Sequence, residues 1–218
     1  MIRLLDFSLS LITIIFLLPL FLLIMIILYF SGESKIWYFQ ERIGQDYKHF
    51  KLIKFATMKE NSPSLGTGSL TIKNDPRILP FGRFLRKTKI NELPQLMNVL
   101  KGEMSLVGPR PLTDEAFFRY PKDSQKTISQ IKPGLSGLGS ILFRNEEELL
   151  NENVDPIKFY VDVIAPEKAK VEIWFSKNNT LKNYLKIIIA TLVIVIFPKV
   201  NILKIFFKEL PNIDLDHN

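Results

Sequence analysis

The amino-acid sequence predicts an α+β protein, with an apolar membrane helix at the N-terminus, a small mixed α/β domain after it, and an amphipathic helix near the C-terminus. Three observations predict this class. The stretch Phe7–Phe30 carries no charged side chain, two β-rich stretches follow it, and a well-delimited helix pattern occupies residues 91–101. A chain of 218 residues holds one domain with a substantial core besides a membrane segment. We place the boundaries at 1–31, 32–180 and 181–218.

The N-terminal apolar stretch is long enough to cross a bilayer. As a straight helix, Phe7–Phe30 measures roughly 36 Å, at about 1.5 Å per residue, against a hydrocarbon core of about 30 Å. Pro19 lies near its middle and cannot donate a backbone hydrogen bond to the carbonyl of Ile15. Two arrangements are therefore open: a kinked helix that spans the membrane once, and a re-entrant helix that enters and leaves through the same face. Arg3 and Lys35 place positive charge on both sides of the stretch, which does not oppose a same-side exit.

Two strands and a loop follow the membrane segment. β-branched and aromatic residues in Ile36–Gln40 and Phe50–Met58 predict a pair of strands joined through a turn at Gly44. Residues 60–70 are rich in Ser, Gly and Pro, which predicts a plain linker or, beside a functional site, a lid. The charged segment 71–88 predicts either a solvated face or a surface that meets phosphate groups.

The helix pattern at residues 91–101 has clear start and stop signals. Asn91 is a favourable N-cap with Glu92 in the first turn, and Lys101 followed by Gly102 is a typical stop. The helix dipole and the free N–H groups at such a start favour anions, so Asn91 and Glu92 mark a candidate site. Four apolar residues are spaced as one helix face: Leu93, Leu96, Met97 and Leu100.

An arginine lies between two prolines beyond this helix. Pro109 and Pro111 flank Arg110, and Pro111 drives Arg110 into an extended conformation. A guanidinium held in this way suits a phosphate clamp, although a surface helix with a Pro-rich turn explains the same spacing. The glycine-rich segment Lys132–Gly139 is a second place where backbone N–H groups can approach a phosphate.

Five segments occur in the order QERIG at Gln40–Gly44, FKLIKFATM at Phe50–Met58, NDPRILPFGRFLRKT at Asn74–Thr88, NELPQLMNVLKGEMSLVGPRPL at Asn91–Leu112, and IKPGLSGLGS at Ile131–Ser140. Together they resemble the bacterial sugar transferases, the monotopic polyprenyl-phosphate phosphoglycosyl transferases in their short single-domain form. The resemblance covers the chain from Arg3 to about Leu192. Its most specific blocks are NELPQL and VGPRPL.

The resemblance implies an enzyme of the bacterial cytoplasmic membrane whose catalytic domain faces the cytoplasm. Such an enzyme transfers a phosphosugar from a UDP-sugar to undecaprenyl phosphate or a related polyprenyl phosphate, releases UMP, and so begins a surface polysaccharide or glycoconjugate. The implied cofactor is Mg²⁺. The implied partners are the UDP-sugar, the polyprenyl phosphate and the membrane, and a homodimer is left open. For the N-terminal helix the resemblance favours the re-entrant arrangement, with its break at Pro19.

In the family, the site helix starts with an Asp–Glu pair whose Asp attacks the β-phosphorus of the nucleotide sugar. Here Asn91 stands at the position of that Asp, which leaves three hypotheses: Glu92 or another carboxylate takes over, Asn91 is an introduced substitution that silences the enzyme, or the chain is a weakened homologue that still binds its ligands. Glu92 is the expected catalytic residue and Mg²⁺ ligand. The expected phosphate and substrate contacts are Lys54, Arg77, Arg86, Arg110 and Arg144.

The composition of the chain limits the classes of partner that it is expected to bind. The chain carries 29 Lys and Arg against 22 Asp and Glu, a net charge of +7, which suits nucleic acid or an anionic lipid surface. Its basic residues are dispersed and no nucleic-acid module is recognisable, so we predict a membrane surface and no nucleic acid. The absence of cysteine excludes disulfides and thiolate metal sites. The alternative function is a non-catalytic membrane scaffold that binds nucleotide sugar or lipid phosphate.

A second apolar run lies near the C-terminus. Ile187–Phe197 is short for a membrane span, and lysines flank it at Lys186 and Lys199. This pattern predicts an amphipathic helix that lies in the headgroup region rather than a second transmembrane helix.

Overall fold

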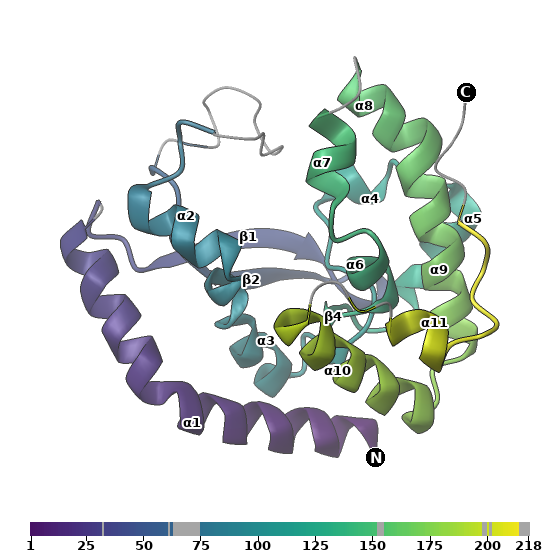
Figure 1. The fold of residues 1–218 in the computed structure, drawn as a ribbon, viewed down its shortest axis with the longest axis horizontal. Coiled ribbons are helices and arrows are strands. Elements are labelled where there is room, and N and C mark those ends of the chain that lie inside the picture. The colour runs from purple at the N-terminus through teal and green to yellow at the C-terminus, as the bar shows by residue number, and fades with distance from the viewer. Residues whose placement is uncertain are drawn as a thin grey trace.

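The computed structural model describes residues 1–31, 33–60, 62, 75–151, 155–197, 200 and 202–213. The predicted α+β class is confirmed, because helices predominate and the strands form two small two-stranded sheets. Figure 1 shows the long N-terminal helix along one side of the molecule, with the sheets and the other helices gathered beside it. Most of the loop predicted at 60–70, with its proposed lid, lies outside the described residues.

The N-terminal helix α1 runs from Ile2 to Ser31 and contains Pro19. Figure 1 shows that it bends, as expected where a proline removes a backbone hydrogen bond. In the described part of the chain, α1 alone has the length and apolar character to cross a membrane. Many of its large apolar side chains are exposed, among them Ile12, Phe16 and Leu23.

Both halves of α1 are attached to the same domain. In the first half, Arg3 donates hydrogen bonds to the Val99 and Leu100 carbonyls, the latter at 2.7 Å. In the second half, Phe21 lies 5.4 Å from the Phe55 ring, centroid to centroid. The apolar cluster around this contact consists of Phe21, Ile24, Leu28, Phe55 and Leu85. α1 is therefore packed against the folded domain in both of its halves, on either side of Pro19.

The first sheet confirms the predicted pair of strands. β1 (Trp37–Ile43) pairs antiparallel with β2 (His49–Phe55), and the short 3-10 turn η1 (Gln45–Tyr47) joins them. Alternation along β1 places residues 38, 40 and 42 on the face that carries residues 50, 52 and 54 of β2. This face holds basic side chains from both strands.

The predicted N-cap at Asn91 is wrong. After α2 (Pro80–Lys87), the chain makes a 3-10 turn, η3 (Ile90–Glu92), and the helix α3 begins only at Gln95 and ends at Lys101. Lys89 has a left-handed backbone with φ of 59°, which starts the 3-10 turn, and the Glu92 N–H bonds to the Lys89 carbonyl. No side chain caps α3. The predicted stop is confirmed, since Gly102 ends the helix with φ of 85°.

Part of the glycine-rich segment, Gly134–Ser136, forms a strand. β3 (Ser105–Val107) pairs in parallel with β4 (Gly134–Ser136). Strands of this length are too short to be predicted from the periodicity of the sequence. The Gly108 N–H bonds to the Ser136 carbonyl at 2.9 Å, and the Gly134 N–H bonds to the Pro109 carbonyl at 2.8 Å. A Cβ on Gly134 would lie 2.0 Å from the Gly108 nitrogen, so the glycine allows the two backbones to approach.

Helices form the rest of the domain. A π-helical turn, η4 (Tyr160–Ile164), leads into the long helix α9 (Ala165–Lys177). The main core packs α9 against α6 and against the start of α10, with Leu138, Val171 and Ile187 fully buried. The remaining helices are α4 (Asp114–Phe117), α5 (Lys122–Ser129), α6 (Leu138–Leu142), α7 (Glu146–Asn151) and α8 (Pro156–Phe159).

Two helices end the described chain, α10 (Leu181–Ile196) and α11 (Ile202–Phe206). α10 confirms the predicted C-terminal helix. One of its faces is buried through Tyr184, Ile187 and Ala190, and a second face exposes large apolar side chains: Leu185, Ile189, Leu192, Val195 and Ile196. An apolar face of this kind suits contact with lipid.

Candidate anion-binding site

The candidate site centres on the carboxylate of Glu92. Its Oε1 accepts a hydrogen bond from Lys54 Nζ at 3.0 Å and another from Arg110 Nη2 at 3.2 Å. Among the described residues its Oε2 has no hydrogen-bond partner. Three of the predicted site residues, Glu92, Lys54 and Arg110, therefore meet at one place, although they come from three separate segments.

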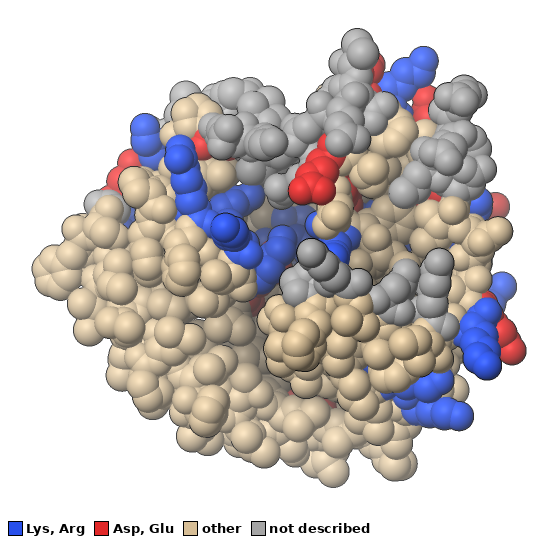
Figure 2. Space-filling view, viewed as in Figure 1, with Lys and Arg blue, Asp and Glu red and all other residues tan. Residues whose placement is uncertain are grey.

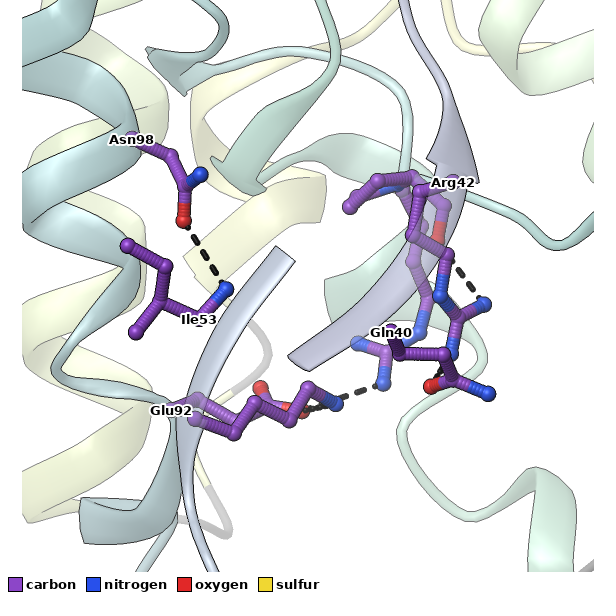
Figure 3. A network of polar contacts seen from close by, with 8 residues as sticks. Gln40, Arg42, Ile53, Glu92 and Asn98 are labelled. Carbon is purple, nitrogen blue, oxygen red and sulfur yellow. Dashed lines mark hydrogen bonds and ion pairs between the residues drawn. The ribbon is translucent and has the colours of Figure 1, made fainter. Parts of the chain in front are cut away.

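Asn98 fixes the sheet against the site helix. It is fully buried on α3, where its side-chain oxygen accepts the Ile53 N–H at 3.0 Å and its amide nitrogen donates to the Lys51 carbonyl at 2.8 Å. Figure 3 shows this contact beside the group around Glu92. Because β2 is fastened to α3 in this way, Lys54 at the end of β2 is brought opposite Glu92.

Arg42 is a residue of this group that the sequence analysis missed. It lies on β1, donates from Nη1 to the Pro111 carbonyl at 3.2 Å, and donates from Nη2 to Gln40 Oε1 at 2.5 Å. Figure 3 shows Arg42 close to the side chains around Glu92. The position of Arg42 in the QERIG segment could have revealed it, because strict alternation along paired strands puts Arg42 and Lys54 on the same face of the hairpin.

The electrostatics of the site favour a bound anion. Burial opposes the charge on Glu92, but Arg110 and Lys54 outweigh this effect and hold the pKa of the carboxyl well below its usual range. Burial, Arg110 and Arg42 together lower the pKa of Lys54 to about 8, while Glu92 acts in the opposite direction. Burial and the nearby Arg110 lower the pKa of Arg42 to about 10. At neutral pH three cations thus surround one carboxylate, an excess of positive charge that suits phosphate groups.

The other predicted phosphate-binding residues lie elsewhere. Arg77 is buried and donates to both oxygens of Asp75, at 2.9 Å from Nε to Oδ1 and 2.6 Å from Nη2 to Oδ2. Arg86 lies half-buried in the last turn of α2, and its charge helps to lower the pKa of Asp75 after the larger effect of Arg77. Arg144 is exposed in the turn between α6 and α7. Within the described residues, none of these three arginines pairs with Glu92.

Asn91 is buried next to the group, and its side-chain oxygen has no hydrogen-bond partner among the described residues. In that same part of the chain, no three His, Cys, Asp or Glu side chains gather as a metal site. Mg²⁺ is commonly held by one or two protein oxygens together with substrate phosphates. Glu92 Oε2 and the Asn91 oxygen fit such a shared arrangement, in which the substrate supplies the remaining ligands.

The surface around the site divides into charged and uncharged regions. Figure 2 shows Lys and Arg side chains gathered over α2 and in the hollow beside it, whereas the region of α1 and α10 is almost free of charge. The long apolar surface beside the site is typical of a membrane-associated protein, and the cationic site itself suits an anionic ligand.

The comparisons with known proteins agree with this class. The chain belongs to the bacterial sugar transferase family, whose model matches residues 1–198. It is 35% identical over 203 residues to the UDP-galactose-lipid carrier transferase of Erwinia amylovora and 36% identical over 173 residues to the undecaprenyl-phosphate galactose phosphotransferase of Salmonella typhimurium. It covers 38% and 33% of the lengths of these two relatives, with 87% and 73% of its own length. The exopolysaccharide production protein ExoY of Sinorhizobium fredii is 36% identical over 155 residues, which are 65% of this chain and 68% of that relative.

Proposed function

We propose that this chain transfers a sugar phosphate from a UDP-sugar to a polyprenyl phosphate such as undecaprenyl phosphate, releasing UMP, as the first membrane step in the assembly of a surface polysaccharide. The observation that carries the proposal is the carboxylate of Glu92 among Lys54, Arg42 and Arg110, next to the uncharged surface of α1. The names of the relatives, which include undecaprenyl-phosphate galactose and glucose phosphotransferases, support it.

The reaction exchanges one phosphorus–oxygen bond for another. An oxygen nucleophile attacks the β-phosphorus of the UDP-sugar, the bond to UMP breaks, and UMP leaves with the bonding electrons. If the nucleophile belongs to the protein, an oxygen of the polyprenyl phosphate then attacks the phosphosugar and frees the protein group. Asn91 is neutral and a poor nucleophile. We therefore assign the role to Glu92, either as nucleophile or as the group that assists direct transfer.

The cations around Glu92 have two roles in this proposal. Lys54, Arg42 and Arg110 bind the diphosphate oxygens and stabilise the charge on departing UMP. Mg²⁺ is the proposed cofactor: Glu92 and Asn91 would help to hold it, and it would offset the repulsion between an anionic nucleophile and the diphosphate. The active domain faces the cytoplasm, where UDP-sugars are available.

The test is UMP release by the detergent-solubilised chain with Mg²⁺, undecaprenyl phosphate and a panel of UDP-sugars. We expect release that EDTA and Glu92→Gln abolish and that the surface control Glu115→Gln leaves unchanged. Intact-mass spectrometry after incubation with the UDP-sugar separates the two routes, because only a protein nucleophile gains the mass of a phosphosugar. If the wild-type chain neither releases UMP nor gains this mass, the proposed activity is wrong.

A second candidate is binding without turnover, as in a scaffold that retains nucleotide sugar or lipid phosphate at the membrane. Asn91 is the observation that favours it, because an amide stands where the family resemblance implies a nucleophile. Asn91→Asp distinguishes the two functions. A rise in UMP release by orders of magnitude would favour the scaffold or a silenced enzyme, whereas an active wild-type chain would favour Glu92.

A further inference from the structure

Gln95 is a buried glutamine in the wall of the candidate site. It is the first residue of α3 and is only 3% exposed. It follows Glu92 by one helical turn, a spacing that puts the two side chains on the same side of the chain. In the described part of the chain, the polar side chains that line the hollow are those of Arg42, Lys54, Glu92, Gln95 and Arg110. Among them, Gln95 is the only side chain without a charge.

The amide of Gln95 differs from the buried amides that have structural roles. Within the described residues, the buried amide side chains are those of Asn91, Gln95, Asn98 and Gln125. Asn98 is bonded to the backbone of β2, and Gln125 donates to the Tyr120 carbonyl at 2.7 Å. In that part of the chain, the Gln95 side chain makes no hydrogen bond, and the Asn91 oxygen has no partner either. The buried amides that lack partners are therefore the two closest to Glu92 in sequence.

The unbonded amide of Gln95 is open to the hollow. In the described part of the chain, the fully enclosed side-chain atoms without a hydrogen-bond partner are Ser10 Oγ, Arg42 Nε, Asn91 Oδ1 and Glu172 Oε2. Neither polar atom of Gln95 is among them, so the small exposed part of this residue includes its amide. A buried amide without a partner costs free energy, and a ligand in the hollow would recover that cost.

The chemistry of an amide identifies the part of the ligand that it suits. Phosphate oxygens only accept hydrogen bonds, and Lys54, Arg42 and Arg110 already present more donors than a diphosphate needs. An amide has a donor at Nε2 and an acceptor at Oε1, and both are neutral. A sugar hydroxyl also donates and accepts, so it can satisfy both atoms of the amide. Gln95 therefore complements an uncharged, hydroxyl-bearing group rather than a phosphate.

We propose that Gln95 binds a hydroxyl group of the sugar in the nucleotide sugar and so helps to select the donor. This inference rests on the proposed function, in which the β-phosphorus is attacked beside Glu92. The sugar is bonded to the β-phosphate through its anomeric oxygen, whereas uridine lies beyond the α-phosphate. A side chain one helical turn from Glu92 is therefore placed beside the sugar end of the donor rather than the nucleoside end.

The test compares binding of UDP with binding of two UDP-sugar analogues to the full-length chain in detergent with Mg²⁺, by calorimetry. The analogues are those of UDP-galactose and UDP-glucose in which a methylene group replaces the oxygen between the two phosphorus atoms, so that no transfer occurs. Gln95→Met keeps the length of the side chain and removes the amide. It is expected to weaken the tighter-binding analogue about tenfold, as the loss of one hydrogen bond does, and to leave UDP binding within about twofold of wild type.

The matched control is Gln125→Met. Gln125 is a buried glutamine on α5 whose amide is bonded away from the site, so this change is expected to lower thermal stability without altering either affinity. Where Gln95→Met does not fold, Gln95→Asn withdraws the amide from the hollow and is expected to weaken the analogue selectively.

Three results would overturn the inference: equal weakening of UDP and analogue in the Gln95 variant, unchanged affinity for both, or a wild-type chain that binds UDP but neither analogue. The proposed activity fails separately. A chain that shows the expected pattern yet releases no UMP from native UDP-sugars with undecaprenyl phosphate would contradict that activity alone. A wild-type chain that binds neither UDP nor the analogues would refute both.

Discussion

At the scale of a single residue, burial sets the pH range over which Lys54 is charged. Among the described residues its ammonium group donates to Glu92, and it therefore keeps donors for a ligand. Its pKa is lowered to about 8, first by burial and then by Arg110 and Arg42, with Glu92 acting in the opposite direction. The positive charge that it lends to the site is thus present at neutral pH and lost in mild alkali.

This shift predicts that UDP binding weakens as the pH rises through about 8. At pH 9, only roughly a tenth of Lys54 remains protonated if its pKa is about 8. Lys54→Arg is the matched control, because arginine stays charged across this range. We expect calorimetry to show a several-fold loss of affinity between pH 7.5 and pH 9 in the wild type and little loss in Lys54→Arg. An equal loss in both would contradict a role for Lys54 ionisation.

Glu172 predicts a pH dependence of stability. Burial raises its pKa from 4.5 to about 7, so the folded state binds a proton more tightly than the unfolded state does. The resulting stability is fully present below pH 4.5 and is lost as the pH rises through about 7, on the order of 3 kcal/mol in all. Thermal unfolding in detergent is expected to occur at lower temperature at pH 8 than at pH 5.5, and Glu172→Gln is expected to reduce this difference. An unchanged pH dependence in Glu172→Gln would disprove the assignment.

At the scale of elements, α1 is joined to the domain by a buried polar contact as well as by apolar packing. Asp6 accepts hydrogen bonds from Ser105 Oγ and the Leu106 N–H, both at 2.9 Å, and from the Tyr184 hydroxyl. It thereby connects α1 to β3 and α10. β3 leads directly into the Pro109–Pro111 segment. The same strand therefore attaches the membrane helix and positions Arg110.

Removing this contact is expected to destabilise the protein strongly. Asp6→Leu removes the acceptor that Ser105, Leu106 and Tyr184 share, and each buried donor left without an acceptor costs about 1–3 kcal/mol. Ser105 Oγ and the Tyr184 hydroxyl keep their mutual contact of 3.2 Å. Tyr184→Phe removes only one of the three donors and serves as the graded control. Thermal unfolding in detergent is expected to rank wild type above Tyr184→Phe and Tyr184→Phe above Asp6→Leu. Equal stability of Asp6→Leu and wild type would show that the contact contributes nothing.

At the scale of the whole molecule, both halves of α1 pack on one domain. Arg3 and Asp6 attach the first half, and Phe21 and Leu28 pack the second half on the first sheet and α2. A helix that crossed the bilayer once would place its two ends on opposite sides. The packing therefore supports the re-entrant arrangement, with the bend at Pro19 inside the membrane and the uncharged region of Figure 2 facing lipid.

This arrangement predicts that both ends of α1 are accessible from the same side. The chain contains no cysteine, so single cysteines can be introduced ahead of Met1, at Lys35, and at Asp123 on α5 as a domain marker. In sealed proteoliposomes, a membrane-impermeant maleimide is expected to label all three positions to the same extent. Labelling of the N-terminal cysteine opposite to that of Lys35→Cys and Asp123→Cys would establish a spanning helix.

Local patterns in the sequence determined a large part of this protein's secondary structure. The uncharged stretch around Pro19, the two strands of the first sheet, and the stop at Gly102 follow from periodicity, charge and glycine conformation, which act over a few neighbouring residues. Glu92, Lys54 and Arg110 were recognisable as site residues because they lie in blocks that resemble one family. The N-cap at Asn91 was wrong because Lys89 adopts a left-handed conformation that starts a 3-10 turn, and composition does not reveal this.

Only the tertiary structure decided which residues meet. Arg42 enters the site through strand register, Asn98 fastens β2 to α3, and Asp6 binds β3 and α10. The tertiary structure also showed that Arg77 pairs with Asp75 rather than with Glu92. Each of these outcomes depends on contacts between distant segments, whose burial and hydrogen bonding arise from the packing of the whole chain.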